Sequence, residues 1–127
     1  MPKYAHAADA GMDLFCREKT VIAAGSSALF DTGVHLDIPN GFYGKISSKS
    51  GLCVKYDIVS EAGVIDSGYT GSIVVKLRNN SDATHVFLAG YKIAQLIIQP
   101  CEHPELVQVD DLEETERGNG GFGSTGR

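Results

Sequence analysis

The stretch GSIVVKLRN, residues 71–79, decides the fold class of this chain. Its apolar residues Ile73, Val75 and Leu77 occupy every second position, a period typical of a β-strand with one buried face. The same period recurs in four further stretches: GVHLDIP at 33–39, THVFLAG at 84–90, YKIAQLIIQP at 91–100 and ELVQVDDL at 105–112. Turn residues separate these stretches, and only SGLCVKY at 50–56 is expected to form a short helix. The pattern predicts an all-β, jelly-roll-like barrel or sandwich with at most one short helix.

Length and charge exclude several classes of protein. The chain has 127 residues, 43% of them apolar, which predicts one domain with one core. No stretch is long and apolar enough for a membrane span, and the first residues lack the apolar run of a signal peptide, so no membrane partner is expected. A net charge of −5 argues against a general nucleic-acid binder. A polyanionic substrate would therefore need local cations or a metal ion.

The cysteines and histidines predict no disulfide framework and no structural zinc. Cys16, Cys53 and Cys101 are widely spaced and form no C-x-x-C pair, which is typical of reduced thiols in a cytoplasmic compartment. The four histidines show no metal-ligand spacing.

The glycine-rich end, RGNGGFGSTGR at 117–127, contains a G-x-G-x-x-G pattern. That pattern binds a dinucleotide only between a strand and a helix, and no helix can start after Gly123. Composition alone favours a frayed terminus. The alternative is a pliable arm that closes over a phosphorylated base, with Phe122 for stacking, Arg117 as a cation, and Ser124 and Thr125 as hydroxyl donors.

Three segments place polar side chains where a phosphate or a metal could use them. AGMDL at 10–14 sets Asp13 between apolar residues. SSKSGL at 47–52 combines Lys49, Ser50 and Gly51, and it fits a phosphate nest and a simple polar turn equally well. GYKIAQL at 90–96 holds Gln95 in an apolar strand, where it is either a core amide with internal partners or a site residue.

The segment GVIDSGYTG at 63–71 is the most specific of these patterns. Asp66 follows the apolar residues Val64 and Ile65, while Tyr69 and Gly71 suit a tight hairpin. A carboxylate in such a place can serve as a general base.

Taken in order, AGMDL, SKSG, GVIDSGYTG, GYKIAQLI and RGNGGFGSTG resemble the five motifs of the homotrimeric dUTPases, the deoxyuridine triphosphate nucleotidohydrolases. The resemblance runs from Ala10 to Gly126, nearly the whole chain. It implies a jelly-roll homotrimer whose active sites are shared between subunits. Residues 1–116 would form the jelly-roll domain, and residues 117–127 a flexible arm that closes over a neighbouring subunit's site.

The resemblance also implies a reaction, the Mg²⁺-assisted hydrolysis of dUTP to dUMP and pyrophosphate, which keeps uracil out of DNA and supplies dUMP for dTMP synthesis. Asp66 would be the general base for the water that attacks the α-phosphorus, and Tyr69 would lie under the deoxyribose. Asp13 would hold Mg²⁺ through water. The other implied substrate contacts are Gly63 and Ile65 in the uracil hairpin, Lys49, Ser50, Gly51 and Gln95 at the phosphates, and Arg117, Phe122, Gly123, Ser124 and Thr125 in the arm.

Three positions depart from the family pattern. Lys49 stands where arginine is usual, and lysine cannot make a bidentate contact. Met12 replaces an aromatic residue, and Glu61 lies near the uracil hairpin, where an inward carboxylate would disfavour a nucleotide anion.

Two other functions stay open at this point. A dCTP deaminase shares the fold but needs a catalytic glutamate after the hairpin, where this chain has Lys76. A dUTPase-like domain could also act as a non-catalytic binding module. The presence of Asp66 and of the arm favours catalysis.

Overall fold

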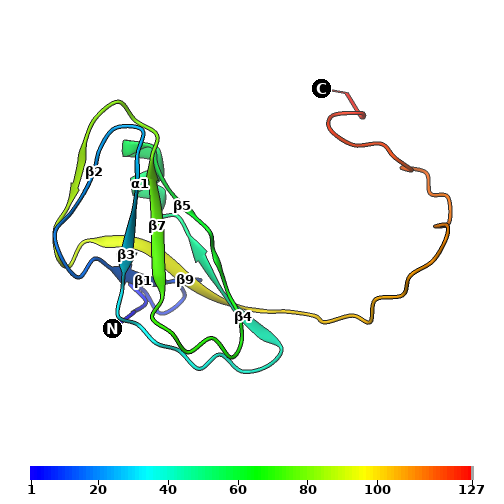
Figure 1. Cartoon of the computed structure of the whole chain (residues 1–127), viewed down its shortest axis with the longest axis horizontal. Helices are drawn as coiled ribbons and strands as arrows, with labels where there is room; N and C mark the ends of the chain where they lie inside the picture. The colour runs from blue at the N-terminus through cyan, green and yellow to red at the C-terminus, as the bar shows by residue number, and fades with distance from the viewer. Residues whose placement is uncertain (127) are drawn as a thin grey trace.

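The computed structural model describes residues 1–126, so Arg127, the last residue of the predicted arm, lies outside the described part. In these residues the regular elements are strands, apart from one helix, and irregular segments connect them (Figure 1). The elements are β1 (Met12–Phe15), β2 (Thr20–Ile22), β3 (Ser27–Asp31), β4 (Phe42–Ser47), α1 (Ser50–Tyr56), β5 (Ile58–Glu61), β6 (Val64–Ile65), β7 (Val74–Asn79), β8 (His85–Phe87) and β9 (Lys92–Pro100). The prediction of an all-β fold with one short helix is confirmed.

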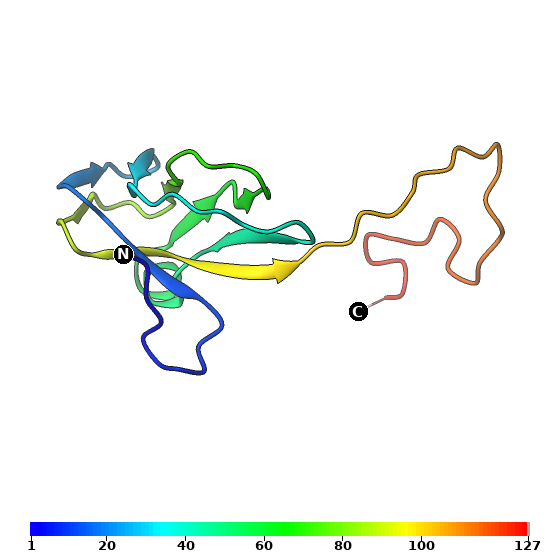
Figure 2. The ribbon, with the colours of Figure 1, turned by 90° about the horizontal axis from the view of Figure 1, so that it is seen from below.

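Three antiparallel sheets share one core. The first has the strand order β1-β9-β4-β6, the second pairs β2 with β8, and the third has the order β3-β7-β5. Figure 2 shows β9 and β4 beneath the β3-β7-β5 sheet. Side chains from all three sheets meet in one hydrophobic cluster, where Phe30 and Phe87 pack edge to face with ring centroids 5.1 Å apart.

The alternation that predicted β7 is borne out by burial. Ile73, Val75 and Leu77 are buried, whereas Val74 and Lys76 are exposed. The predicted helix at 50–56 is also confirmed. It ends where Asp57 adopts a left-handed conformation, with φ of 51°. No helix in the described part is long and apolar enough to cross a membrane.

Two of the predicted strands are wrong. Residues 33–39 bury Ile38 and partly bury Val34 and Leu36, but in the described residues they form no ladder, and their only backbone–backbone bond to the residues that lead into β7 is that from Ile73 N to the Val34 carbonyl. Residues 105–112 are irregular and exposed, and Leu106 is 91% exposed. Alternation of side chains therefore marks an extended segment, but a strand also needs a partner for its backbone groups.

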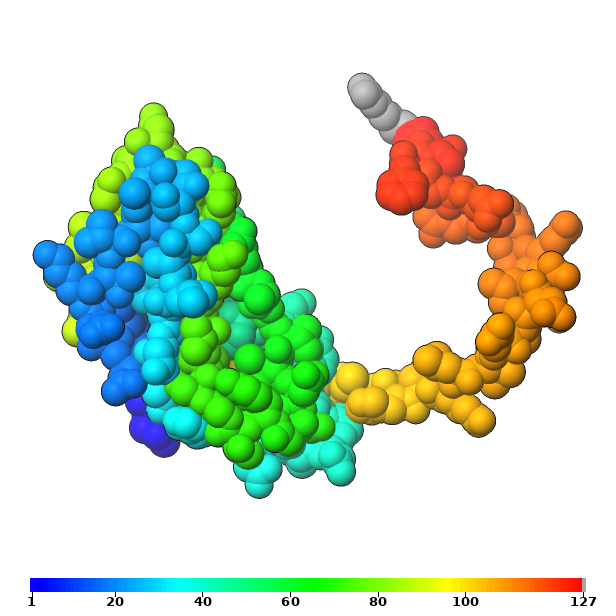
Figure 3. Space-filling view, viewed as in Figure 1, coloured from blue at the N-terminus to red at the C-terminus, as the bar shows by residue number. Residues whose placement is uncertain are grey.

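The chain leaves the strands after Pro100. Residues 102–126 curve away from the body (Figure 3). Their backbone hydrogen bonds are all local turns within the segment. Within the described residues, no hydrogen bond or ion pair joins this segment to the strands. Phe122 is fully exposed.

The buried polar centre of the fold is Asn79, at the end of β7, whose side chain has no exposed surface. Its amide nitrogen donates to the carbonyls of Ile22, Ala23 and Ala83 at 3.2, 3.3 and 2.8 Å, and its oxygen accepts from Ser81. One side chain thus satisfies backbone groups of two separate loops.

We expect Asn79→Ala to lower the free energy of unfolding by about 2–4 kcal/mol, because it leaves several backbone groups without partners. Urea unfolding at one fixed protein concentration measures the change. Asn80→Ala alters an exposed neighbour and should stay within about 0.5 kcal/mol of the wild type. Equal effects of the two substitutions would contradict the role of Asn79.

Candidate active site

The GVIDSGYTG segment forms a tight turn between β6 and β7, and we keep the name hairpin for this segment although the two strands lie in different sheets and do not pair with each other. Tyr69 N donates to the Asp66 carbonyl at 3.2 Å, and Gly68 supplies the left-handed conformation that the turn needs, with φ of 82°. The Tyr69 hydroxyl donates to the Ser72 carbonyl at 2.9 Å. A Cβ atom at Gly71 would lie 2.6 Å from the Tyr69 oxygen, so glycine lets the ring lie against the backbone.

An open cavity of about 170 Å³ lies at this hairpin, lined by Val64, Ile65, Asp66, Tyr69 and Val74. Asp66 and Tyr69 are exposed, while Ile65 is half-buried. The cavity therefore combines an apolar floor with one carboxylate and one aromatic ring at its rim.

The start of the hairpin is fixed against β4. Ile46 N donates to the Gly63 carbonyl at 2.7 Å, and β4 pairs with β6 through Gly44 and Ile65. A Cβ atom at Gly63 would lie 2.8 Å from the Ile46 carbonyl oxygen. Gly63 is thus required for the close approach of the two backbones.

A charge cluster forms around Asp13 on β1, in which the carboxylate is buried and its two lysine partners reach the surface. The Lys49 ammonium lies 2.5 Å from Asp13 Oδ1 and the Lys92 ammonium 2.7 Å from Oδ2, and the Asp13 side chain is only 4% exposed. The Lys49 contact is a hydrogen bond, whereas Oδ2 has only the charge contact with Lys92. Burial alone would raise the pKa of the Asp13 carboxyl. The two ammonium groups lower it by a larger amount, so the pKa lies below its ordinary value.

Gln95 lies opposite Asp13 in the pairing of β1 with β9. Its amide donates to the Ser48 carbonyl at 3.1 Å, and the Ser48 hydroxyl accepts from Ser60 N at 2.8 Å. Gln95 thus has the internal partner expected of a core amide and stands beside Asp13, while its role as a site residue stays a prediction. Ser50 and Gly51 follow Lys49 directly and are exposed at the start of α1.

The predicted site residues therefore form three groups in the single chain. Asp13, Lys49 and Gln95 gather where β1, β9 and the end of β4 meet. Gly63, Ile65, Asp66 and Tyr69 form the hairpin group. The tail residues Arg117, Phe122, Gly123, Ser124 and Thr125 lie apart from both, on the extended segment.

The Glu61 carboxylate, which the sequence placed near the uracil hairpin, has a cationic partner. It pairs with Lys76 in the register of β5 and β7, and the two charged groups lie 2.9 Å apart. The hydrogen bond from Lys76 lowers the pKa of the Glu61 carboxyl below its usual range. Lys76, predicted to stand at the place of a deaminase glutamate, is thus engaged in an ion pair on the sheet.

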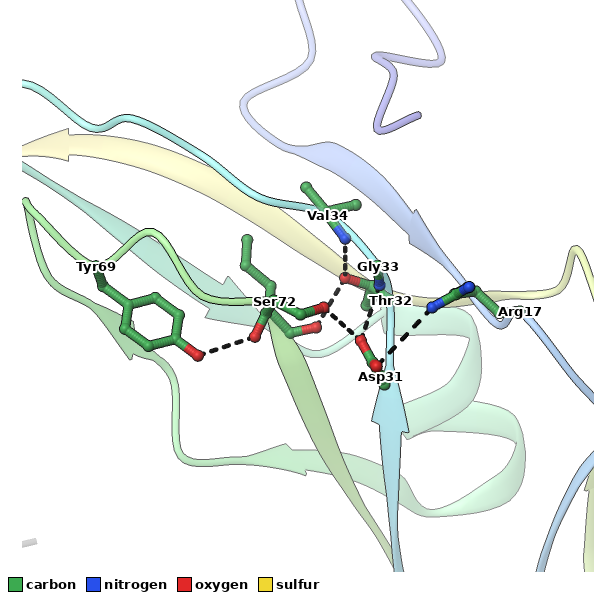
Figure 4. Close-up of polar contacts among 8 residues, drawn as sticks. Arg17, Asp31, Thr32, Gly33, Val34, Tyr69 and Ser72 are labelled. Atoms are coloured by element: carbon green, nitrogen blue, oxygen red, sulfur yellow. Dashed lines mark hydrogen bonds and ion pairs between the residues drawn. The ribbon is translucent and has the colours of Figure 1, made fainter.

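Sequence reasoning missed two sets of residues. Lys92 carries the only charge in YKIAQLIIQP, and this could have marked it as a partner for a buried acid. The second set is Arg17, Asp31 and Ser72, of which Ser72 contacts Tyr69 (Figure 4). All three lie outside the five family-like segments. Nothing in the local sequence signals that these residues meet.

Magnesium, which the resemblance implies, finds no all-protein site in the described residues. No three His, Cys, Asp or Glu side chains gather there, and Asp13 has an ammonium group against each oxygen. Mg²⁺ is usually held by one or two carboxylates together with substrate phosphates. The residues therefore fit an ion that arrives with a polyphosphate and displaces at least one ammonium group, and they do not fit an ion held by protein alone.

Known proteins with similar sequences are deoxyuridine 5'-triphosphate nucleotidohydrolases. The one from Cutibacterium acnes is 45% identical over 99% of this chain and 85% of its own length. The one from Solanum lycopersicum is 44% identical over 99% of this chain and 75% of its own length.

Solved structures give the same result for the fold. The dUTPase of Staphylococcus bacteriophage 80alpha with dUPNHPP has a TM-score of 0.93 and 34% identity, over 100% of this chain and 92% of that one. A dUTPase variant from phage phi11 of S. aureus, described with a structural Mg(II) ion, has a TM-score of 0.83 and 32% identity, over 90% and 92% of the two chains. The dUTPase family model matches residues 1–126, and the chain belongs to the dUTPase family.

Proposed function

We propose that this chain hydrolyses dUTP to dUMP and pyrophosphate. The observation that carries the proposal is the hairpin cavity, where Asp66 stands at the rim and the Tyr69 ring is held by Gly71 and Ser72. A carboxylate open to water beside a small apolar cavity is suited to deprotonate a water molecule next to a bound base and sugar. This reaction would keep uracil out of DNA and supply dUMP for dTMP synthesis.

The hairpin would recognise the nucleoside. Backbone groups around Gly63 and Ile65 would read the uracil edge, and a narrow floor would leave no room for the thymine methyl group. The Tyr69 ring would lie under the deoxyribose and exclude a 2'-hydroxyl. Asp66 would accept a proton from the water that attacks the α-phosphorus.

The charge cluster would receive the phosphates. Lys49 is only 27% exposed and is held by Asp13, so a phosphate would compete with a carboxylate for it. Ser50, Gly51 and Gln95 would add neutral donors. Bound Mg²⁺, held by the triphosphate and by Asp13 through water, would neutralise phosphate charge. These local cations would offset the net charge of −5.

The arm, residues 117–127, would complete the site from another subunit of a homotrimer. The segment makes no polar contact with its own strands in the described part. Its glycines lose much conformational entropy when they become ordered, so the segment is not expected to order by itself. Arg117, Ser124 and Thr125 would bind the γ-phosphate, with Gly123 allowing close approach, and Phe122 would stack on uracil. The three free cysteines fit a cytoplasmic setting.

A dCTP deaminase is the less favoured alternative, because Lys76 stands in the glutamate's place and pairs with Glu61. A non-catalytic binding module is disfavoured because Asp66 is present and accessible.

Purified protein with Mg²⁺ should release pyrophosphate from dUTP far faster than from dTTP, dCTP or UTP, because the hairpin would read the uracil edge, which cytosine lacks, and would exclude a methyl group and a 2'-hydroxyl. The matched variant is Asp66→Asn, which keeps the shape but cannot accept the proton, and it should lower kcat by about 10²–10⁴ while dUTP binding is nearly unchanged. Ammonia release from dCTP would instead identify a deaminase. Nucleotide binding without turnover would identify a binding module.

Asp13→Asn should lower the free energy of unfolding by about 1–3 kcal/mol, because Lys49 and Lys92 lose the anion between them. The pKa of Asp13 is depressed in the folded chain, so its contribution is present above about pH 4 and is lost as the pH falls further. Urea unfolding of the wild type and of Asp13→Asn, at pH 7 and at pH 3, measures the effect of the substitution and its dependence on pH. Asp37→Asn, at an exposed acid without a polar partner in the described part, is the control. An unchanged stability of Asp13→Asn at pH 7 would contradict the cluster's role.

The shared site can be tested by mixing two inactive chains, Asp66→Asn and a chain that ends before Arg117. They are unfolded, mixed equally and refolded. If base and arm come from different subunits, an active site needs its Asp66 from a truncated chain and its arm from an Asp66→Asn chain. Random assembly meets each of these two requirements about half the time, so about a quarter of the sites should regain activity. Mixed trimers that assemble and stay inactive would show that both come from one chain.

A further inference from the structure

A second set of polar contacts lies directly behind the hairpin, at the end of β3 (Figure 4). The Ser72 hydroxyl donates a hydrogen bond to Asp31 Oδ1, and the Ser72 carbonyl accepts one from the Tyr69 hydroxyl at 2.9 Å. Ser72 therefore connects the Asp31 carboxylate to the Tyr69 ring, through its side chain in one direction and its backbone in the other.

Asp31 is a fixed acceptor. It is the last residue of β3 and pairs with Val74 of β7, and its Oδ1 also accepts from Gly33 N at 2.9 Å. The hydrogen bond from Ser72, followed by that from Gly33, lowers the pKa of the Asp31 carboxyl, so the group is a carboxylate at neutral pH. Arg17 lies 3.8 Å away, and both of these side chains are largely exposed, so this ion pair adds little.

The hairpin has few other polar supports. Beyond it, Thr32 Oγ1 donates to the Ile73 carbonyl at 2.7 Å, and Ile73 N donates to Val34 at 2.8 Å. Between Tyr69 and Ile73, the described structure shows only two links to the 31–35 segment: the Ser72 bond to Asp31, and the contact of His35 Nδ1 with the Thr70 carbonyl at 2.8 Å. The peptide that carries the Ser72 carbonyl is thus held from two sides, by its own Ile73 N–H on Val34 and by the Ser72 side chain on Asp31.

The Tyr69 ring cannot be fixed by burial, because the residue is 46% exposed. Its direction depends on the bond to the Ser72 carbonyl and on the close approach to Gly71. A shift of the Ser72 peptide would therefore turn the ring.

We infer that Asp31 is a positioning residue for the sugar site: it fixes Ser72, and through the Ser72 carbonyl it fixes the Tyr69 ring that excludes a 2'-hydroxyl. The inference rests on the proposed function for its last step. Asp31 lies outside all five family-like segments, in LFDTG at 29–33, so the contact is visible only in the fold. Loss of one hydrogen bond should reduce the preference for dUTP over UTP about three- to tenfold.

Four variants separate the hydrogen bond from other effects. Asp31→Ala removes the acceptor, and Ser72→Ala removes the donor while it leaves the carbonyl that Tyr69 uses. Asp31→Asn keeps an acceptor oxygen for Ser72 and Gly33, so this variant should behave like the wild type. Arg17→Ala removes only the distant ion pair and should change nothing.

The first readout needs no nucleotide. In protein with ¹³C-labelled tyrosine rings, the Tyr69 signal is assigned by its loss in Tyr69→Phe. In Asp31→Ala and Ser72→Ala it should move toward the shift of a solvent-exposed tyrosine, while Asp31→Asn and Arg17→Ala leave it in place. An unmoved signal in both alanine variants would overturn the inference.

The second readout is the ratio of kcat/KM for dUTP to that for UTP. It should fall in each alanine variant, and the double variant should fall no further, because both substitutions break the same bond. Additive losses, or an unchanged ratio, would overturn the inference. A wild-type protein that does not hydrolyse dUTP would overturn the proposed function instead, and the tyrosine signals would then still decide whether Asp31 positions the ring.

Discussion

The double pairing of β9 is the constraint on which the rest of the structure depends. β9 is nine residues long and pairs with β1 through Asp13 and Gln95, and with β4 through Ser47 and Gln95. A slip of one residue would turn every side chain to the other face. Since Ile93, Ala94 and Leu96 are fully buried, the core fixes this register, and the register places Asp13 and Gln95 together beside the residues that follow β4. The packing of the apolar core thus determines where these polar residues lie.

The sequence predicted the fold class, the strands β7, β8 and β9, and the helix at 50–56. β7 alternates clearly, β9 is a long apolar run that buries the adjacent residues Ile93 and Ala94, and the helix agrees with the prediction at both ends. β2, β3 and β4 escaped prediction because their short runs mix small and polar residues, and β4 has Gly44 at its centre. The strands wrongly predicted at 33–39 and 105–112 have the period but no partner, and pairing over long sequence separations leaves no local signal.

Prediction of the candidate site depended on how local each contact is. The Asp66–Tyr69 turn is formed by consecutive residues, so its shape could be expected from GVIDSGYTG. The partners of Asp13 are 36 and 79 positions away, and Asp31 is 41 positions from Ser72. Such contacts are fixed by sheet register and loop path. The resemblance to a family named the residues, but only the fold shows that Lys49 is held by a carboxylate before any phosphate arrives.

The three groups of site residues differ in what orders them, and this difference suits a reaction on a triphosphate. The Asp13 cluster is part of the core and the hairpin is pinned to β4 and β3, so both exist before a nucleotide arrives. The tail has no such support, and ordering its glycines costs entropy that only new contacts can repay. Closure of the tail is therefore favourable only when a base and phosphates are present to be covered. In the proposed reaction, a rigid floor would select the nucleoside before the closing arm excludes water around the phosphates.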